Sequence, residues 1–475
     1  MSDEKIAKLI EQEQTRQRDG LELIPSENYV SREVLDAMGS VFTNKYSEGY
    51  PSFDFALRGE NGEIIANKNG EPKKIREISD AEFAKLEQQI GEEILPDKRY
   101  YGGQQNTDRV ERLAIARACR LFDADHANVQ PHSGAQANNA VYNAWLNPGD
   151  TVLGLDLNFG GHLTHGAPVT QSAQIYNFIR YKMNPENGEF DYDEIEKIAL
   201  KEQPKILLVG YSAYPRIPDF AKFAAIAKKI PNCLLMADMA HVAGLIAGKV
   251  HPNPFDFGFH VITTTTHKTL RGPRGGLILS CGIVGNPLKK PEKTLENIPT
   301  LIDRSVFPGT QGGPLEHVIA AKAVAFHEAL QPEFREYAAQ IVKNAAVLAD
   351  ELASRGFKLI TGGTSNHLIL ADVFASFGVS GGEAEKVLDK IGLTLNKNAI
   401  PNDPRKPFDP SGIRLGTPAL TTRGLRENDM KLVAEWIFAA ITGRENPAKL
   451  AKLRDEVRDF SRKFPLSSDK QISSD

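Results

Sequence analysis

From about residue 104 to residue 280, short apolar runs alternate with stretches of helical periodicity. The apolar runs have the length and composition of strands that are buried on both faces of a sheet. Such an alternation predicts an α/β fold, in which a mostly parallel sheet is flanked by helices. The predicted strands are residues 127–130, 151–155, 205–210, 233–238, 259–264 and 275–280, and the predicted helices are 108–121, 137–146 and 219–230.

The chain has 475 residues, which is enough for a large core and a second domain. A helical pattern over 315–355 should lead to a smaller C-terminal part, and a helix over 445–460 should run into a frayed tail. The net charge of −4 gives no basic footprint for nucleic acid, and no apolar stretch is long enough to span a membrane. Three widely spaced cysteines and a charged start without a signal core favour the cytoplasm.

Lys268 follows four consecutive threonines and a histidine, just after the predicted strand 259–264. It therefore lies in a polar turn at a strand end, where Gly272 and Gly275 leave room for a ligand. An enzyme places an amine here when it must form a Schiff base with an aldehyde cofactor. The alternative is an ordinary solvated lysine, but a run of threonines is unusual in a solvent loop.

Asp238 ends the apolar run 233–238, so it should lie at the carboxyl end of a buried strand, where open α/β sheets bind ligands. Pyridoxal phosphate needs an acidic partner for its ring nitrogen, and Asp238 suits that role. His241 would reach the same ring from the next turn. A helix-capping aspartate is the alternative, but Lys268 at the neighbouring strand end favours the cofactor.

Ser133 and Gly134 precede the predicted helix 137–146. A hydroxyl and free backbone amides at a helix N-terminus can hold a phosphate group. Taken alone, Ser-Gly before a helix is often only a cap. Its position one strand-helix unit before the strands that carry Asp238 and Lys268 favours a phosphate cup.

Several blocks of the sequence resemble serine hydroxymethyltransferase, a family of fold-type I pyridoxal-phosphate enzymes related in fold to aspartate aminotransferase. The blocks are residues 23–28, 43–51, 99–103, 160–166, 263–268 and 411–414. The resemblance implies an N-terminal arm (1–51), a large cofactor-binding domain (98–328) and a smaller α+β domain with a frayed tail (329–475). It also implies transfer of the hydroxymethyl carbon of L-serine to tetrahydrofolate, which gives glycine and 5,10-methylenetetrahydrofolate.

The resemblance assigns cofactor roles residue by residue. Lys268 would hold pyridoxal 5'-phosphate as an aldimine, Asp238 would keep its ring nitrogen protonated, and His162 would stack on the ring. A hydrogen-bonded structural histidine is the alternative for His162. The other residues at the family's cofactor positions are Ser133, Gly134, Ala135, Ser212, His241, His267, Gly312 and Gly313.

The substrate positions are implied in the same way. Arg414 and Ser26 would bind the carboxylate of serine, since a guanidinium can hold a carboxylate bidentately. Glu48 would act as the general acid and base, assisted by Tyr46 and Tyr101. The folate positions are Tyr100, Leu157, Gly161 and Asn398. Because the family contributes some of these residues across a subunit interface, the resemblance implies a homodimer and leaves a tetramer open; it implies no metal site.

Residues 52–97 have no counterpart in the family pattern. Asn69-Gly70, between apolar flanks at 63–66 and 73–78, predicts a hairpin. Ser79 should cap a helix over 81–94 with an apolar stripe that includes Ile94. This inserted element is either a neutral surface insertion or a lid or dimer-surface element.

Two other functions remain open. A folate-independent aldolase acting on threonine-like amino acids would share Lys268, Asp238 and Arg414 but would not need the residues at the folate positions. A binding or regulatory protein on an inactive scaffold is a further alternative. The intact Lys268, Asp238, Arg414 and Glu48 disfavour it.

Overall fold

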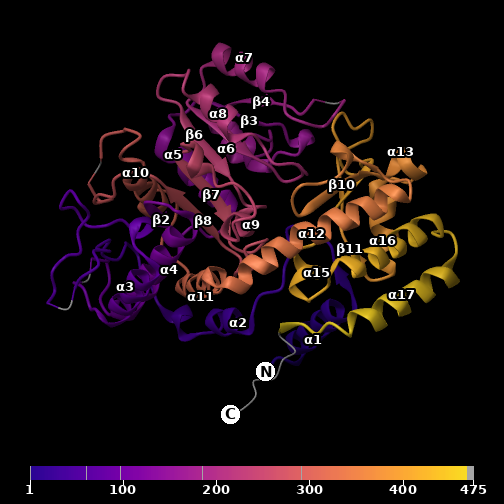
Figure 1. Cartoon of the computed structure of the whole chain (residues 1–475), viewed down its shortest axis with the longest axis horizontal. Helices are drawn as coiled ribbons and strands as arrows, with labels where there is room; N and C mark the ends of the chain where they lie inside the picture. The colour runs from indigo at the N-terminus through magenta and orange to yellow at the C-terminus, as the bar shows by residue number, and fades with distance from the viewer. Residues whose placement is uncertain (1, 60, 97, 185, 290, 468–475) are drawn as a thin grey trace.

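The computed structural model describes residues 2–59, 61–96, 98–184, 186–289 and 291–467 (Figure 1). Its largest element is a seven-stranded sheet with the strand order β2-β8-β7-β6-β5-β3-β4. All neighbouring pairs are parallel except those of β8, which runs antiparallel to both β7 and β2. The strands are β2 (His126–Asn128), β3 (Thr151–Leu155), β4 (Asn177–Tyr181), β5 (Ile206–Gly210), β6 (Leu234–Asp238), β7 (Val261–Thr265) and β8 (Gly276–Ser280).

The predicted α/β class and the predicted strands are confirmed to within two residues at each end. The prediction omits β4, a short strand in which only Phe178 and Tyr181 are buried. Asn177 and Arg180 interrupt the strand with polar side chains, so it lacks the continuous apolar run by which the other strands were predicted.

Helices cover both faces of this sheet (Figure 1). Each of the three helices predicted between the strands is present, and α5 begins at Gly134 because the Ser133 side chain caps its first turn. The helices of this part are α4 (Gln105–Phe122), α5 (Gly134–Trp145), α6 (Gln171–Ile175), α7 (Tyr192–Glu202), α8 (Phe220–Ala227), α9 (Ala243–Ala247) and α10 (Ile298–Arg304).

A second, antiparallel sheet has the order β12-β13-β10-β9 and lies in the orange and yellow part of Figure 1. Its apolar cluster is separate from those of the large sheet and includes Ile369, Ile413 and Leu415. The strands are β9 (Lys358–Leu359), β10 (Leu368–Asp372), β12 (Asn396–Asn398) and β13 (Gly412–Gly416). The helices are α13 (Val373–Phe377), α14 (Gly381–Lys390), α15 (Pro418–Thr422), α16 (Glu427–Thr442) and α17 (Pro447–Ser461).

The helical pattern predicted over 315–355 is two helices and not one. They are α11 (Glu316–Leu330) and α12 (Pro332–Ser354). The break has a local cause: Pro332 disfavours a helical conformation for the residue before it, and Gln331 is extended at φ −75° and ψ 152°. The long helix α12 then leads from the large sheet to the smaller part (Figure 1). The domain boundary after residue 328 remains a prediction.

The N-terminal segment joins both parts. After α1 (Glu4–Asp19), the short strand β1 (Leu21–Glu22) pairs in parallel with β11 (Leu393–Thr394) of the smaller part. The chain then returns through α2 (Arg32–Met38) to pack beside α11. Within the described residues, no helix has the length and apolar character that crossing a bilayer requires. Most of the tail predicted to be frayed lies outside the described residues.

The inserted element 52–97 keeps only part of its predicted form. Its turn is where Asn69-Gly70 predicts it, with Gly70 at φ +80°. The turn closes a minimal hairpin, because Ala66 and Pro72 form an antiparallel bridge, the Asn67 N–H donates to the Glu71 carbonyl at 2.7 Å and the Lys73 N–H donates to the Ile65 carbonyl at 3.4 Å. The described residues of the insertion form one further isolated bridge, Arg58 to Ile64, and no regular strand. The pairing does not continue through the predicted flank 73–78, because residues 75–77 turn into a short 3-10 helix.

The helix of the insertion is α3 (Asp80–Glu92), capped by Ser79 as predicted. It ends before Ile94, which is 67% exposed and not part of the buried stripe. Pro96 limits the preceding residues to extended conformations. Phe83, Leu86 and Ile90 are buried in the same apolar cluster as the large sheet. The insertion therefore packs as a part of the main core.

Candidate active site

Five of the predicted site residues follow five strands of the large sheet at the same edge. Ser133 follows β2, His162 follows β3, Ser212 follows β5, Asp238 ends β6 and Lys268 follows β7. These strands are mutually parallel, so their carboxyl ends meet. This is the edge at which open α/β sheets bind ligands.

Lys268 is a buried amine that carries no ion pair within the described residues. Burial lowers the pKa of Lys268 to about 8, against the opposing influence of the Asp238 carboxylate. Its backbone is held from the N-terminal segment, since Asn28 Nδ2 donates to the Lys268 carbonyl at 2.9 Å. A lowered pKa gives a buried lysine a larger neutral fraction near physiological pH than an exposed lysine has, and the neutral amine is the form that reacts with an aldehyde.

Asp238 is buried but remains a carboxylate. Burial opposes ionisation, yet hydrogen bonds from His165 and Asn138 hold its pKa well below the usual range. His165 Nε2 lies 3.0 Å and Asn138 Nδ2 lies 2.8 Å from Asp238 Oδ2. The other oxygen, Oδ1, accepts from the backbone N–H of Ala240 at 3.1 Å. A permanently charged carboxylate at this place suits a protonated ring nitrogen.

His165 has a defined tautomer. Its Nδ1 accepts from the backbone N–H of His162 at 3.3 Å, so the proton of the neutral ring is on Nε2 and points to Asp238. The ligand atoms of His162, His165 and Asp238 lie within 4.8 Å of one another, a spacing that a metal ion also uses. Here these groups are joined by hydrogen bonds through Thr164 and Asn138.

His162 is a neutral ring in this setting. Burial lowers its pKa to about 4, and its Nδ1 lies 2.8 Å from Thr164 Oγ1. His241 is fully buried with a pKa far below the usual value, mainly because of burial. Its Nδ1 lies 3.2 Å from Nε2 of His367, a partner from the smaller part of the chain. His267, next to Lys268, accepts from the N–H of Gly275 at 3.3 Å, and burial lowers its pKa to about 3.

The predicted phosphate cup lies at the start of α5. The first N–H groups of a helix have no partner within it, so Gly134 and Ala135 present free donors beside the Ser133 hydroxyl. A side chain at Gly134 would come within 2.8 Å of Thr265 Cγ2, so the cup requires glycine there. The preceding His132 has a buried Nε2 without a partner among the described residues. This donor set fits a phosphate group.

Arg414 enters the site from β13 of the smaller sheet. Its Nη1 donates to the Ser212 carbonyl at 2.6 Å and its Nε donates to Asn396 Oδ1 at 3.0 Å. Within the described chain no group binds Nη2, which leaves that nitrogen for a ligand. Burial lowers the pKa of Arg414 to about 10, so the group stays charged at neutral pH. Ser26 follows Pro25, which packs against Gly416 of the same strand.

A second group of predicted residues forms an exposed wall, which we call the Glu48 wall and define as Tyr46, Glu48, Tyr101, Gly312 and Gly313. The Tyr46 hydroxyl donates to Glu48 Oε1 at 3.4 Å, and the rings of Tyr46 and Tyr101 meet edge to face at 5.3 Å. Glu48 raises the pKa of Tyr46. A side chain at Gly312 would lie 3.3 Å from Glu48 Oε1. Tyr46 and Tyr101 are 60% and 48% exposed.

The structure does not join the two groups. No hydrogen bond, ion pair or ring contact among the described residues links Tyr46, Glu48 or Tyr101 with Lys268 or Arg414. The four predicted folate residues are also dispersed. Leu157 and Gly161 follow β3, Asn398 ends β12, and Tyr100 lies on the side of the Glu48 wall. Tyr100 is 62% exposed and packs against Phe307, with ring centroids 5.7 Å apart.

Sequence reasoning missed several residues that shape this site. They are Asn28, Asn138, His165, Phe307, His367 and Asn396. Two of them had a usable signal, since Asn28 and His165 lie within blocks that carry the family resemblance. Asn138 and Asn396 lie in a helix and a strand whose patterns give no indication of a polar function, and Phe307 and His367 lie in irregular segments that carry no motif.

Comparison with known proteins agrees with the resemblance. The family model described as serine hydroxymethyltransferase matches residues 1–64 and 58–437, and the two matches meet within the insertion. A serine hydroxymethyltransferase of Acidobacterium capsulatum is 49% identical over 465 residues, which cover 98% of this chain and 94% of that protein. One of Koribacter versatilis is 48% identical over 471 residues, which cover 99% of this chain and 96% of that protein.

Proposed function

The chain belongs to the serine hydroxymethyltransferase family, and from that premise we propose that it moves the hydroxymethyl carbon of L-serine to tetrahydrofolate. The products are glycine and 5,10-methylenetetrahydrofolate. The observation that carries the proposal is the convergence of a buried amine, a buried carboxylate and a half-buried arginine, namely Lys268, Asp238 and Arg414.

Pyridoxal 5'-phosphate is the cofactor that these residues fit. Ser133, Gly134 and Ala135 would hold its phosphate, with His267 beside the cup. Asp238 would pair with the ring nitrogen. His162, Ser212 and His241 complete the ring site that we propose. When bound, the cofactor supplies an electron sink for cleavage of the bond between Cα and Cβ of serine.

The protein's own residues then have separable tasks. The Arg414 guanidinium, already oriented by Ser212 and Asn396, binds the carboxylate of serine together with the Ser26 hydroxyl. Lys268 would hold the cofactor through its amine, whose lowered pKa increases the fraction in the reactive neutral form. The His165–Asp238 hydrogen bond keeps the carboxylate charged and fixed, so it stabilises positive charge at the ring nitrogen.

Glu48 is the residue that we propose for moving the proton of the serine hydroxyl, with Tyr46 and Tyr101 on the same wall. Tyr100, Leu157, Gly161 and Asn398 are proposed to contact the folate. Because the Glu48 wall is exposed and does not contact Lys268, we propose that it completes the site of a partner subunit, together with Gly312 and Gly313. An active monomer in sedimentation at assay concentration would refute this homodimer; a tetramer built from such dimers is compatible with it.

The test is the visible absorption of the purified protein, alone, with glycine, and with glycine plus tetrahydrofolate. We expect a yellow protein that develops a strong long-wavelength band only when both ligands are present. A yellow protein that does not respond to folate would favour a folate-independent aldolase on the same scaffold. A protein that stays colourless after pyridoxal phosphate is added would refute the cofactor assignment.

A further inference from the structure

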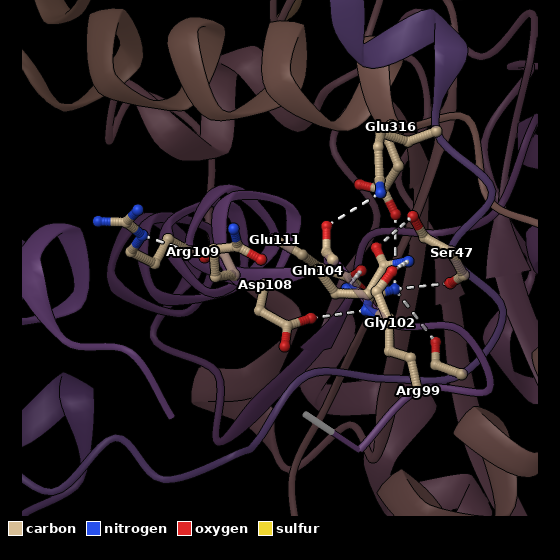
Figure 2. Close-up of polar contacts among 12 residues, drawn as sticks. Ser47, Arg99, Gly102, Gln104, Asp108, Arg109, Glu111 and Glu316 are labelled. Atoms are coloured by element: carbon tan, nitrogen blue, oxygen red, sulfur yellow. Dashed lines mark hydrogen bonds and ion pairs between the residues drawn. The ribbon is translucent and has the colours of Figure 1, made fainter. Parts of the chain in front are cut away.

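Arg99 belongs to the block 99–103 but has no role in the site described so far. Its side chain is fully buried, whereas the side chains of Tyr100 and Tyr101 are exposed. Figure 2 shows the guanidinium among three carboxylates, those of Asp108, Glu111 and Glu316. Arg99 Nε lies 2.6 Å from Asp108 Oδ1, and Nη2 lies 2.7 Å from Glu111 Oε2.

The same guanidinium reaches the backbone on both sides of Glu48. Arg99 Nη1 donates to the Ser47 carbonyl at 2.8 Å and approaches the Gly49 carbonyl at 3.4 Å. Gln130 Nε2 donates to Gly49 as well, at 2.9 Å. The chain at Glu48 is therefore attached on both sides to buried polar groups.

The neighbouring carbonyls are held in the same way. Gln104 Nε2 donates to the Tyr46 carbonyl at 3.1 Å, and its Oε1 accepts from the Ser47 hydroxyl at 2.9 Å. The backbone N–H of Tyr100 donates to the Glu48 carbonyl at 3.1 Å. All four consecutive carbonyls from Tyr46 to Gly49 thus accept hydrogen bonds from outside their own segment, so its backbone has one defined path.

The carboxylates hold Arg99 in turn. Asp108 and Glu111 lie on consecutive turns of α4, and Glu316 begins α11 at 3.4 Å from Nη1. Burial raises the pKa of Glu316 and of Glu111, whereas the Arg99 guanidinium beside them opposes that shift and favours their charged forms. Both helices belong to the main core, which makes this a rigid support.

We propose that Arg99 is a positioning residue, which fixes the backbone of residues 46–49 and so orients the Glu48 carboxylate for proton transfer. This inference rests on the proposed function of Glu48. Arginine suits the role because its planar group has five N–H donors spread over three nitrogens. A lysine has three donors on one nitrogen and cannot reach Asp108, Glu111 and Ser47 together.

The kinetic test is a double-mutant cycle between Arg99→Lys and Glu48→Gln. Arg99→Lys keeps the buried charge, so we expect a folded protein that binds its cofactor. It should lower folate-dependent turnover by about 30-fold in the native background but by less than about 3-fold when Glu48 is already glutamine. Gln104→Leu, which leaves all charges in place, should show the same non-additive pattern with a smaller loss.

Arg117→Lys is the matched control. Arg117 lies on α4, the helix that carries Asp108 and Glu111, and is largely buried, but it pairs with Glu87 of the insertion at 2.6 Å and with the Ala323 carbonyl at 2.8 Å. Its effect on turnover should be small and should add to that of Glu48→Gln. Equal losses for Arg99→Lys in the two backgrounds would overturn the proposal.

A second readout does not depend on activity. The Tyr100 amide, bound to the Glu48 carbonyl, should exchange with deuterium faster in Arg99→Lys than in the native protein, and should be unchanged in Arg117→Lys. Unchanged exchange in Arg99→Lys would also overturn the proposal. A native protein that transfers no hydroxymethyl group would refute the proposed function, while the exchange result would still decide whether Arg99 holds this segment.

Discussion

The strand-end site around Lys268 and the Glu48 wall differ in how they are built. In the first, Asp238 and Lys268 are buried at the ends of parallel strands, and the Asp238 carboxylate is held by His165 and Asn138 of the same subunit. The second is exposed, and it is carried by irregular segments that depend on buried partners for their shape. A sheet edge therefore positions directly the residues that we propose hold the cofactor, whereas the wall that we propose moves a proton depends on Arg99 and Gln104 for its backbone path.

The largest expected effect lies in the strand-end site. Lys268→Ala removes the amine that we propose for covalent chemistry, so turnover should fall by at least about 10³-fold. The measurement is the rate of glycine formation from serine, with the exposed Lys201→Ala as the control. A Lys268→Ala protein with more than about a tenth of the native rate would contradict the assignment.

Arg414→Lys should separate substrate binding from proton transfer. A lysine cannot keep the contacts to Ser212 and Asn396 and also hold a carboxylate, so the KM for serine should rise by about 100-fold. Glu48→Gln should instead lower kcat and leave the dissociation constant of glycine within about twofold. If both variants raise the dissociation constant of glycine by the same factor, the two regions do not have the separate tasks that we propose.

His165→Leu tests the support of Asp238. Loss of a hydrogen bond to a charged group costs about 1.5–3 kcal/mol, so affinity for pyridoxal phosphate should fall by roughly 10- to 100-fold. Equilibrium dialysis of the cofactor is the measurement. His260→Leu removes a half-buried histidine near the opposite edge of the sheet, where it binds the Leu235 N–H, and should leave this affinity unchanged.

The lowered pKa of Lys268 predicts a pH dependence. Below pH 8 the side chain is mostly an ammonium group without a free electron pair, and above pH 8 it is mostly a neutral amine. Reductive alkylation of the cofactor-free protein by formaldehyde should therefore rise about tenfold per pH unit up to about pH 8 and then level off. The contact with Glu202 raises the pKa of Lys201, so alkylation of Lys201 should still increase with pH at pH 9. Peptide mass mapping measures the alkylation of Lys268 and Lys201 at each pH. The same pH dependence at both residues would contradict the lowered pKa of Lys268.

The smallest expected effect on activity concerns the insertion. Leu86→Ala opens a cavity in the main core, so the free energy of unfolding should fall by about 2–5 kcal/mol in denaturant titration. Turnover and the KM for folate should not change at a temperature where the variant is folded. A changed KM for folate would assign the insertion to the active site.

Sequence reasoning reached the strand-end site because its signals are local. A buried parallel strand is a continuous apolar run, and a polar residue at its end, such as Asp238 or Lys268, is visible in the same window. An apolar run does not report strand direction, so the antiparallel orientation of β8 could not be predicted from it. The split at Gln331 lies inside a long stretch of helical periodicity, which continues on both sides of the break. The residues of the Glu48 wall came from the family resemblance alone.

The supports of both regions escaped prediction for a physical reason. Asn138 and His165 meet Asp238 only after strands and helices distant in the sequence have packed. The same holds for Asn28, which lies 240 residues from the carbonyl that it binds. Periodicity reports which face of an element is buried, but it does not report which buried polar groups will find each other.

The buried carboxylates around Arg99 also constrain how this protein is made. Glu316 follows Arg99 by 217 residues, so at a ribosomal rate of about 5–20 residues per second the arginine waits roughly 10–40 s for that partner. During this interval α4, which carries Asp108 and Glu111, has been synthesised, but α11, which carries Glu316, has not. Tyr50, which is buried in the finished subunit, also lacks the Asp303 carbonyl that its hydroxyl binds. Newly made chains should depend most on chaperones during this interval.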